Sequence, residues 1–117
     1  MPMNASLEPT HAPIDIEIED EDLWELVPEF LANRRRDVDS LRAAVQCGDH
    51  ATIQRLGHNM KGTGAPFGFQ EITEIGTGLE VAGRDAANAS AASLTDRLDD
   101  YLTRLQVVPA FSPPPAL

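Results

Sequence analysis

The chain is poor in cysteine, lysine and aromatic residues. Cys47 is the only cysteine among 117 residues, so an internal disulfide and a metal site built on thiolate pairs are both excluded. Aromatic residues make up 5% of the chain against 42% hydrophobic residues, so we expect a core of Leu, Val, Ile and Ala. Lys61 is the only lysine, and every other basic residue is arginine.

Several functional segments are also missing. No stretch approaches 18 apolar residues, so we expect no membrane span. The N-terminus has neither an apolar run nor a basic lead, which argues against a signal peptide and, with the lone cysteine, favours a cytoplasmic location. We find no glycine-rich nucleotide motif, no Ser-His-Asp order and no metal cluster, so an autonomous kinase is not expected.

The net charge of −10 is distributed unevenly. Residues 1–30 hold nine acidic residues and no basic one, whereas residues 31–117 are close to neutral. Binding to nucleic acid requires clustered Lys and Arg, so we exclude it as a partner. The short run Arg34-Arg35-Arg36 is interpreted as a solvated helix face.

The length and the proline distribution predict one folded domain with two unfolded ends. Seven of the nine prolines lie near the termini. We assign residues 1–19 to a disordered acidic leader, 20–106 to the folded domain and 107–117 to a disordered Pro-rich tail. Ile14, Ile16 and Ile18 alternate with acids as in a strand, but a lone strand would have nothing to pair with.

The domain should be helical throughout. Acids at 20–22 precede a short first helix in which Trp24 packs, and Pro28 suits the first position of a new helix that ends at Gly48. Asp49 is a candidate N-cap for a third helix over about 50–64. A fourth follows the Pro66–Phe69 turn and ends near Gly83.

A loop over 85–92, with Ser90 as a possible cap, leads to the last helix. Its apolar residues recur at the helical period from Leu94 to Leu105. Short connections between amphipathic helices predict an all-α fold, an antiparallel four-helix bundle with a short additional N-terminal helix. We expect it to be a monomer.

The mid-chain stretch from Gly57 to Phe69 carries the candidate site. Ile53, Leu56 and Met60 form one apolar stripe, and His58 lies roughly 200° from Leu56 and Met60 at about 100° per residue. His58 should therefore point into solvent, with Lys61 beside it one turn on.

Four glycines surround this pair, at 57, 62, 64 and 68. A glycine inside a helix costs roughly 1 kcal/mol relative to alanine, so each needs a reason. A turn explains Gly64 and Gly68. For Gly57 and Gly62, which flank His58, we consider local bareness, that is, the absence of side chains beside the histidine. It would let another protein approach the imidazole closely.

His58-x-x-Lys61-Gly62, with Gly68 ten residues after the histidine, resembles the motif of the histidine-containing phosphotransfer (HPt) domain. The Gly68-Phe69 turn and the later Leu79-Glu80 are also similar to that family. The resemblance covers about residues 20–106. Pro66 is a departure, because many members keep a helical residue there.

The resemblance implies a carrier in a two-component phosphorelay. His58 would take a phosphoryl group from a receiver-domain aspartate or a histidine kinase and pass it to another receiver. Lys61 would partly neutralise the phosphohistidine, and Gly62 would leave room for it. The partner surface would comprise Gly62, Gly68, Arg55 and Gln54. Mg²⁺ would belong to the partner receiver, and this chain would hold no cofactor or metal and would not be an enzyme.

Other interpretations remain open at this point. The bundle could be a docking module that binds or inhibits a kinase or response regulator without phosphorylation of His58. A bundle that carries a metal or cofactor would need inward-facing ligands, and the predicted stripes contain none apart from Met60. The leader and tail suit either a free-standing protein or a piece of a hybrid kinase.

Overall fold

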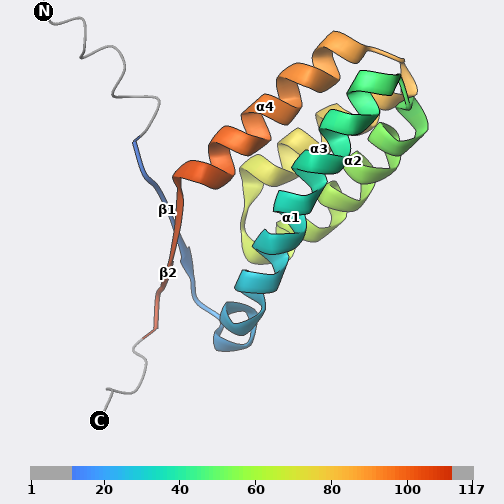
Figure 1. The fold of residues 1–117 in the computed structure, drawn as a ribbon. Helices are drawn as coiled ribbons and strands as arrows, with labels where there is room; N and C mark the ends of the chain where they lie inside the picture. Colours follow the sequence, from blue (N-terminus) through green and yellow to red (C-terminus); the bar gives the residue numbers. More distant parts are fainter. Residues whose placement is uncertain (1–11, 112–117) are drawn as a thin grey trace, which may run out of the picture.

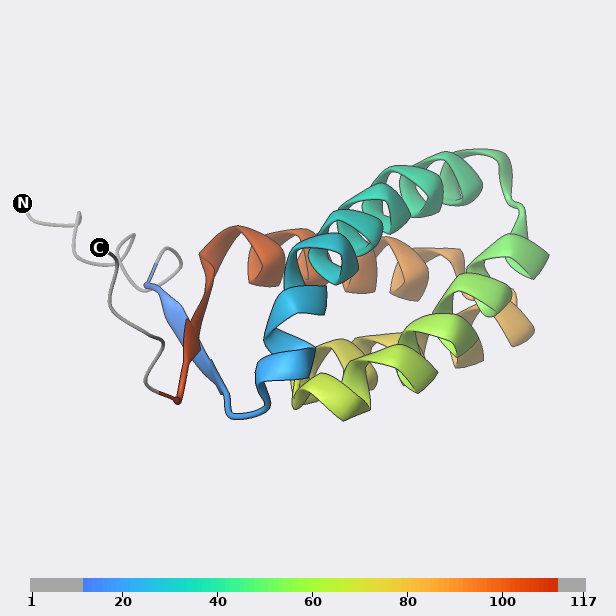
Figure 2. The same ribbon diagram turned by 90° about the horizontal axis from the view of Figure 1, so that it is seen from below.

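The computed structural model describes residues 12–111 as four helices and a pair of strands. The order along the chain is β1 (Ile14–Ile18), α1 (Glu21–Cys47), α2 (His50–Gly64), the short 3-10 helix η2 (Ala65–Phe67), α3 (Gln70–Arg84), α4 (Asn88–Arg104) and β2 (Leu105–Pro109). The helices lie side by side as a bundle, and the two strands lie beyond one end of it (Figures 1 and 2). The predicted all-α four-helix bundle is confirmed.

The predicted additional N-terminal helix is wrong, because α1 runs without a break from Glu21 to Cys47. Pro28 lies inside it, where a proline removes one backbone hydrogen bond and costs roughly 3 kcal/mol. Val27 and Phe30, on either side of Pro28, are both buried in the core. Their burial offsets the cost, and the first turns of α1 bend relative to the rest of the helix (Figure 2).

The turn between α1 and α2 follows its local sequence. Gly48 has a left-handed φ of 70°, and its N–H bonds to carbonyls of the last turn of α1. The Asp49 side chain accepts a hydrogen bond from the Thr52 N–H and caps α2. Both positions were predicted, and so were the bounds of α2.

α4 begins earlier than the sequence suggested. Asn88 is its first residue, so Ser90 lies inside the helix and is not its cap. The sequence predicts a loop from Asp85 to Ala92 because the segment is small and polar. Alanine is the best helix former, and Ala91 is fully buried against the core. Packing therefore extends the helix through this segment.

The expectation that residues 14–18 have no partner is also wrong. β1 pairs in parallel with β2, with Ile14 opposite Leu105 and Ile18 opposite Pro109. Residues 14–18 of the predicted leader are thus joined to 105–109, which includes the start of the predicted tail. The remainder of the two predicted disordered segments, 1–11 and 112–117, lies outside the described residues.

The core contains residues from all four helices and from β1. Phe69 is fully buried, and its ring stacks on Phe30 with centroids 5.4 Å apart. Phe67, half-buried, packs at a tilt against the Phe30 ring, with centroids 4.5 Å apart. Both phenylalanines thus pack the turn after α2 against α1. None of the described helices is long and apolar enough to cross a membrane.

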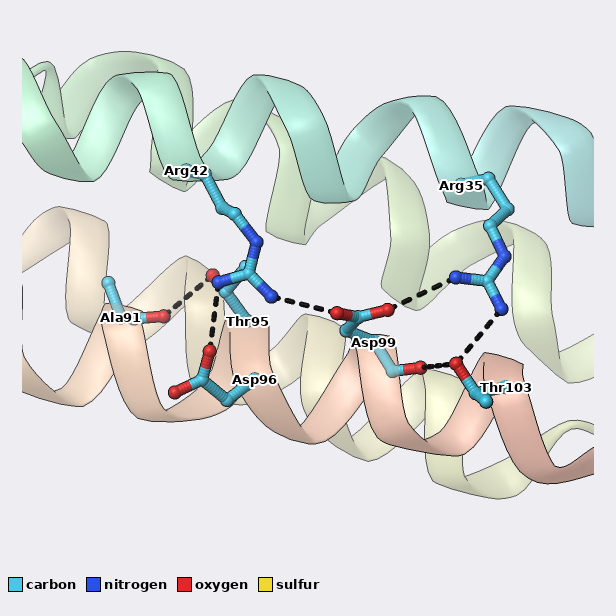
Figure 3. A network of polar contacts seen from close by, with 7 residues as sticks. All are labelled: Arg35, Arg42, Ala91, Thr95, Asp96, Asp99 and Thr103. Carbon is cyan, nitrogen blue, oxygen red and sulfur yellow. Dashed lines mark hydrogen bonds and ion pairs between the residues drawn. The ribbon is translucent and has the colours of Figure 1, made fainter.

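Arginines also join helices. Arg35 and Arg42 of α1 both bond to Asp99 of α4, and Arg42 also reaches Asp96 (Figure 3). These pairs are exposed, so each contributes about 0–1 kcal/mol and helps to set the register of the two helices.

Arg34 departs from the predicted solvated face. It is buried, with its Nε 2.8 Å from Asp37 Oδ2 and its Nη1 donating to the Thr63 hydroxyl of α2. Its guanidinium carbon lies 4.8 Å from the centre of the Phe30 ring. The long aliphatic part of an arginine side chain packs against apolar neighbours, so an arginine can interrupt an apolar stripe and still be buried.

Candidate functional site

His58 lies in the ninth position of α2, on the polar face that the helical period predicted. Its side chain is 65% exposed, while Ile53 and Met60 on the other face are fully buried. The helix thus holds the imidazole at the surface on a rigid backbone. A partner protein can reach it without unfolding any part of the bundle.

A carboxylate on the neighbouring helix holds the His58 ring. Glu80 of α3 places Oε2 2.9 Å from His58 Nδ1. Hydrogen bonds from Lys61 and then from His58 hold the pKa of the Glu80 carboxyl below its usual value of 4.5, so Glu80 is ionised at neutral pH and can only accept. Nδ1 must therefore carry the proton, which leaves the lone pair of the neutral ring on Nε2.

Lys61 lies beside His58 as predicted, but both bind the same acid. Lys61 Nζ donates to Glu80 Oε1 at 2.7 Å, and its side chain is 40% exposed. The three groups form a surface chain of alternating charge in which Glu80 bridges the histidine and the lysine. If an anionic group were bonded to Nε2, the Lys61 ammonium could offset its charge, and the Glu80 carboxylate would still accept the hydrogen bond from Nδ1.

The glycines near His58 have different roles. Gly62 is exposed, and a Cβ built on it would meet nothing within 4 Å, in keeping with an open approach to His58. Gly57 is buried against the α3 backbone, so local bareness is the wrong explanation for it. Gly68 has a φ of 80° and ends η2, so its backbone conformation alone accounts for a glycine there.

The other predicted partner-surface residues lie where the helix period placed them. Gln54 and Arg55 are exposed on α2, one turn before His58. Arg55 also contributes to the electrostatic surroundings of Asp37 on α1. Gly68 follows the end of α2, ten residues from His58, so it belongs to the turn at the end of the hairpin.

Glu80 is the site residue to which sequence reasoning assigned no role. A signal for it existed in the hairpin of α2 and α3. Three of the close backbone contacts in this hairpin join residues whose numbers sum to 137: Gly57 with Glu80, Lys61 with Gly76 and Gln54 with Gly83. His58 and Glu80 sum to 138, so symmetry about the Gly68-Phe69 turn would have placed the acid beside the histidine.

No metal site stands out in the part of the chain that the structure describes. Residues 12–111 contain no group of three His, Cys, Asp or Glu side chains that could hold a metal ion. His50, at the start of α2, has a buried Nε2 without a described hydrogen-bond partner and lies two turns from His58. His11 lies outside the described residues.

Comparison with known proteins identifies one family. The family model described as Hpt domain matches residues 25–107, which is well over half of the chain. No curated protein and no solved structure gives a significant match. The matched range begins inside α1 and ends within β2, so it contains all of α2, α3 and α4 together with the His58–Glu80–Lys61 group.

Proposed function

Because the chain belongs to the Hpt domain family and so has a histidine phosphotransfer role in two-component signalling, we propose that His58 is the residue that carries the phosphoryl group. The group arrives from a receiver-domain aspartate or from a histidine kinase, free or hybrid, and leaves to another receiver. The chain acts in the cytoplasm as a monomeric carrier and not as an enzyme. It needs no cofactor of its own, and Mg²⁺ belongs to the receiver.

The observation that carries this proposal is the hydrogen bond between His58 Nδ1 and Glu80. It orients the ring and leaves Nε2 as the nucleophile. In the transfer, the Nε2 lone pair attacks the phosphorus atom of an aspartyl phosphate. The P–O bond to the aspartate breaks, and its electron pair leaves on the carboxylate oxygen.

The same bond stabilises the product. After the N–P bond forms, the Nδ1 proton remains between His58 and Glu80, so the positive charge of the ring faces a carboxylate. Lys61, one turn away, offers an ammonium group to the phosphoryl oxygens. Gly62 leaves space beside the ring, and Arg55 and Gln54 are exposed for contact with the partner.

The test is phosphoryl transfer from a panel of phosphorylated receiver domains to the purified chain. Wild type, His58→Gln and His50→Gln are compared, since His50 lies on the same helix and controls for the loss of any histidine. We expect acid-labile label on wild type and on His50→Gln, and none on His58→Gln. Equal label on His58→Gln would refute the assignment.

The docking alternative predicts a different pattern. A module that acts by binding alone would bind a kinase or receiver tightly and take no label from any of them. It would also keep its regulatory effect when His58 is replaced by Gln. Binding and label are therefore measured on the same samples.

A further inference from the structure

α2 and α3 touch through their backbones beside the site. A Cβ built on Gly57 would lie 2.4 Å from the Glu80 nitrogen and 2.7 Å from the Gly76 oxygen. A Cβ built on Gly76 would lie 2.6 Å from the Lys61 nitrogen and 2.8 Å from the Gly57 oxygen. Both glycines are buried, and the atoms they would strike are backbone atoms that cannot rotate away.

Gly57 and Gly76 contact the backbones of Glu80 and Lys61, whose side chains bond to each other at the site. Gly57 lies next to His58 in the chain and packs on Glu80 across the hairpin. Gly76, one turn before Glu80, packs on Lys61. The side-chain bonds from His58 and Lys61 to Glu80, 2.9 Å and 2.7 Å long, therefore join α2 to α3 where the two glycines keep the helix backbones close together.

The two glycines lower the stability of the helices that contain them, and ordinary packing of two helices through side chains would not require them. Each glycine inside a helix costs roughly 1 kcal/mol relative to alanine, and helices usually pack 8–10 Å apart through side chains. With alanine at either position, α3 would have to move away from α2 until the Cβ clears the opposite backbone. Such a shift would lengthen the contact from Glu80 to His58, because Gly57 adjoins His58 in the chain and packs on the Glu80 backbone.

We propose that Gly57 and Gly76 are positioning residues for phosphoryl transfer. By holding the two backbones in contact, they keep the Glu80 carboxylate on His58 Nδ1, and so keep the ring proton on Nδ1 and the lone pair on Nε2. The inference rests on the proposed role of His58 as phosphoryl carrier. It adds that the reactive tautomer is set by the distance between two helix backbones.

The test compares two alanine variants of α3. Gly76→Ala moves α3 away from α2, whereas Gly78→Ala, two residues on, faces the flexible Leu94 side chain of α4. Both gain the same helix propensity. The ring tautomer is measured by ¹⁵N NMR of the His58 side chain, assigned by comparison with His58→Gln. The rate of phosphorylation is measured with phosphoramidate as a small-molecule donor, which removes partner docking from the readout.

We expect wild type and Gly78→Ala to hold the proton on Nδ1 and to react at rates within about twofold of each other. Gly76→Ala should give a mixture of tautomers and a rate about tenfold lower, the size expected for loss of one charge-assisted hydrogen bond. A folded Gly76→Ala with unchanged tautomer and rate would overturn the proposal.

A second variant keeps the test decisive if Gly76→Ala does not fold. Glu80→Asp retains the charge, shortens the side chain by one methylene and leaves the glycine contacts intact, so it moves the carboxylate away from His58 Nδ1 without moving a helix. It should reproduce the tautomer mixture and the slower rate, and wild-type behaviour would overturn the proposal. The tautomer is measured without phosphorylation. If His58 is not the phosphoryl carrier, wild type accepts no label, and this result is separate from the tautomer measurement.

Discussion

The buried pair of Arg34 and Asp37 allows a sharp test of the energetics of this bundle. The two side chains are 11% and 15% exposed, and their charged atoms lie 2.8 Å apart. Burial raises the pKa of the Asp37 carboxyl, and the attraction of Arg34 does not fully compensate for this effect. The Asp37 carboxylate therefore loses more free energy of hydration on burial than it regains from its interaction with Arg34. We expect the pair to contribute little net stability despite its good geometry.

The perturbation is a double-mutant cycle with Arg34→Met, Asp37→Leu and both together. Removing one partner leaves a buried charge, which typically costs 3–5 kcal/mol, and the partial exposure here lowers the cost to about 2 kcal/mol for each single change. The double variant replaces the pair by apolar side chains of similar length beside Phe30. It should lie within about 1 kcal/mol of wild type, which gives a coupling of about 3–5 kcal/mol.

The assay is urea unfolding of the four proteins at pH 7, followed by circular dichroism. If the double variant is as unstable as the sum of the two single variants, the coupling is zero, the two side chains act independently and the reasoning is refuted. If each single change costs less than about 0.5 kcal/mol, the pair behaves as a surface ion pair and the argument from burial fails.

The pH dependence gives an independent check of the same pair. The folded protein holds the Asp37 proton more tightly than the unfolded chain, whose carboxyl has a pKa of 3.8. Stability should therefore fall as the pH rises from 3.8 through the raised folded pKa. The Asp37→Leu variant should lose this part of the pH profile, and an unchanged profile would contradict the assignment.

Two further predictions concern other titrating groups. Burial raises the pKa of Tyr101, the only tyrosine, to about 12, so phenolate absorbance of the native protein should titrate near 12 and that of the urea-unfolded chain near 10, with stability falling as the pH rises between them. A native midpoint near 10 would show an exposed ring. Hydrogen bonds from Thr52 lower the pKa of the Asp49 cap below 3.8, so the cap stabilises the fold above that pH and is lost as the pH falls through the folded value. At pH 7 the urea midpoint should fall for Asp49→Ala and stay near wild type for Asp49→Asn, which caps but does not titrate; equal losses would contradict a capping role.

The sequence by itself determined the bounds of α2 and the face on which His58 lies. α2 could be placed from Asp49 to Gly64, and His58 could be put opposite Ile53 and Met60, because cap chemistry and the 3.6-residue period are local properties. The turn at Gly68 was equally legible, since a left-handed φ favours glycine whatever surrounds it. The family resemblance rests on residues of this same stretch.

The tertiary structure alone decided which distant groups meet. β1 pairs with a strand 91 residues away, Arg34 bonds to Thr63 of the next helix, and α1 continues through Pro28 where Val27 and Phe30 are buried in the core. Glu80 lies beside His58 where glycines bring the backbones of α2 and α3 into contact. These outcomes depend on the free energy of contacts between segments, which no local pattern encodes, and they convert an exposed histidine into an oriented nucleophile.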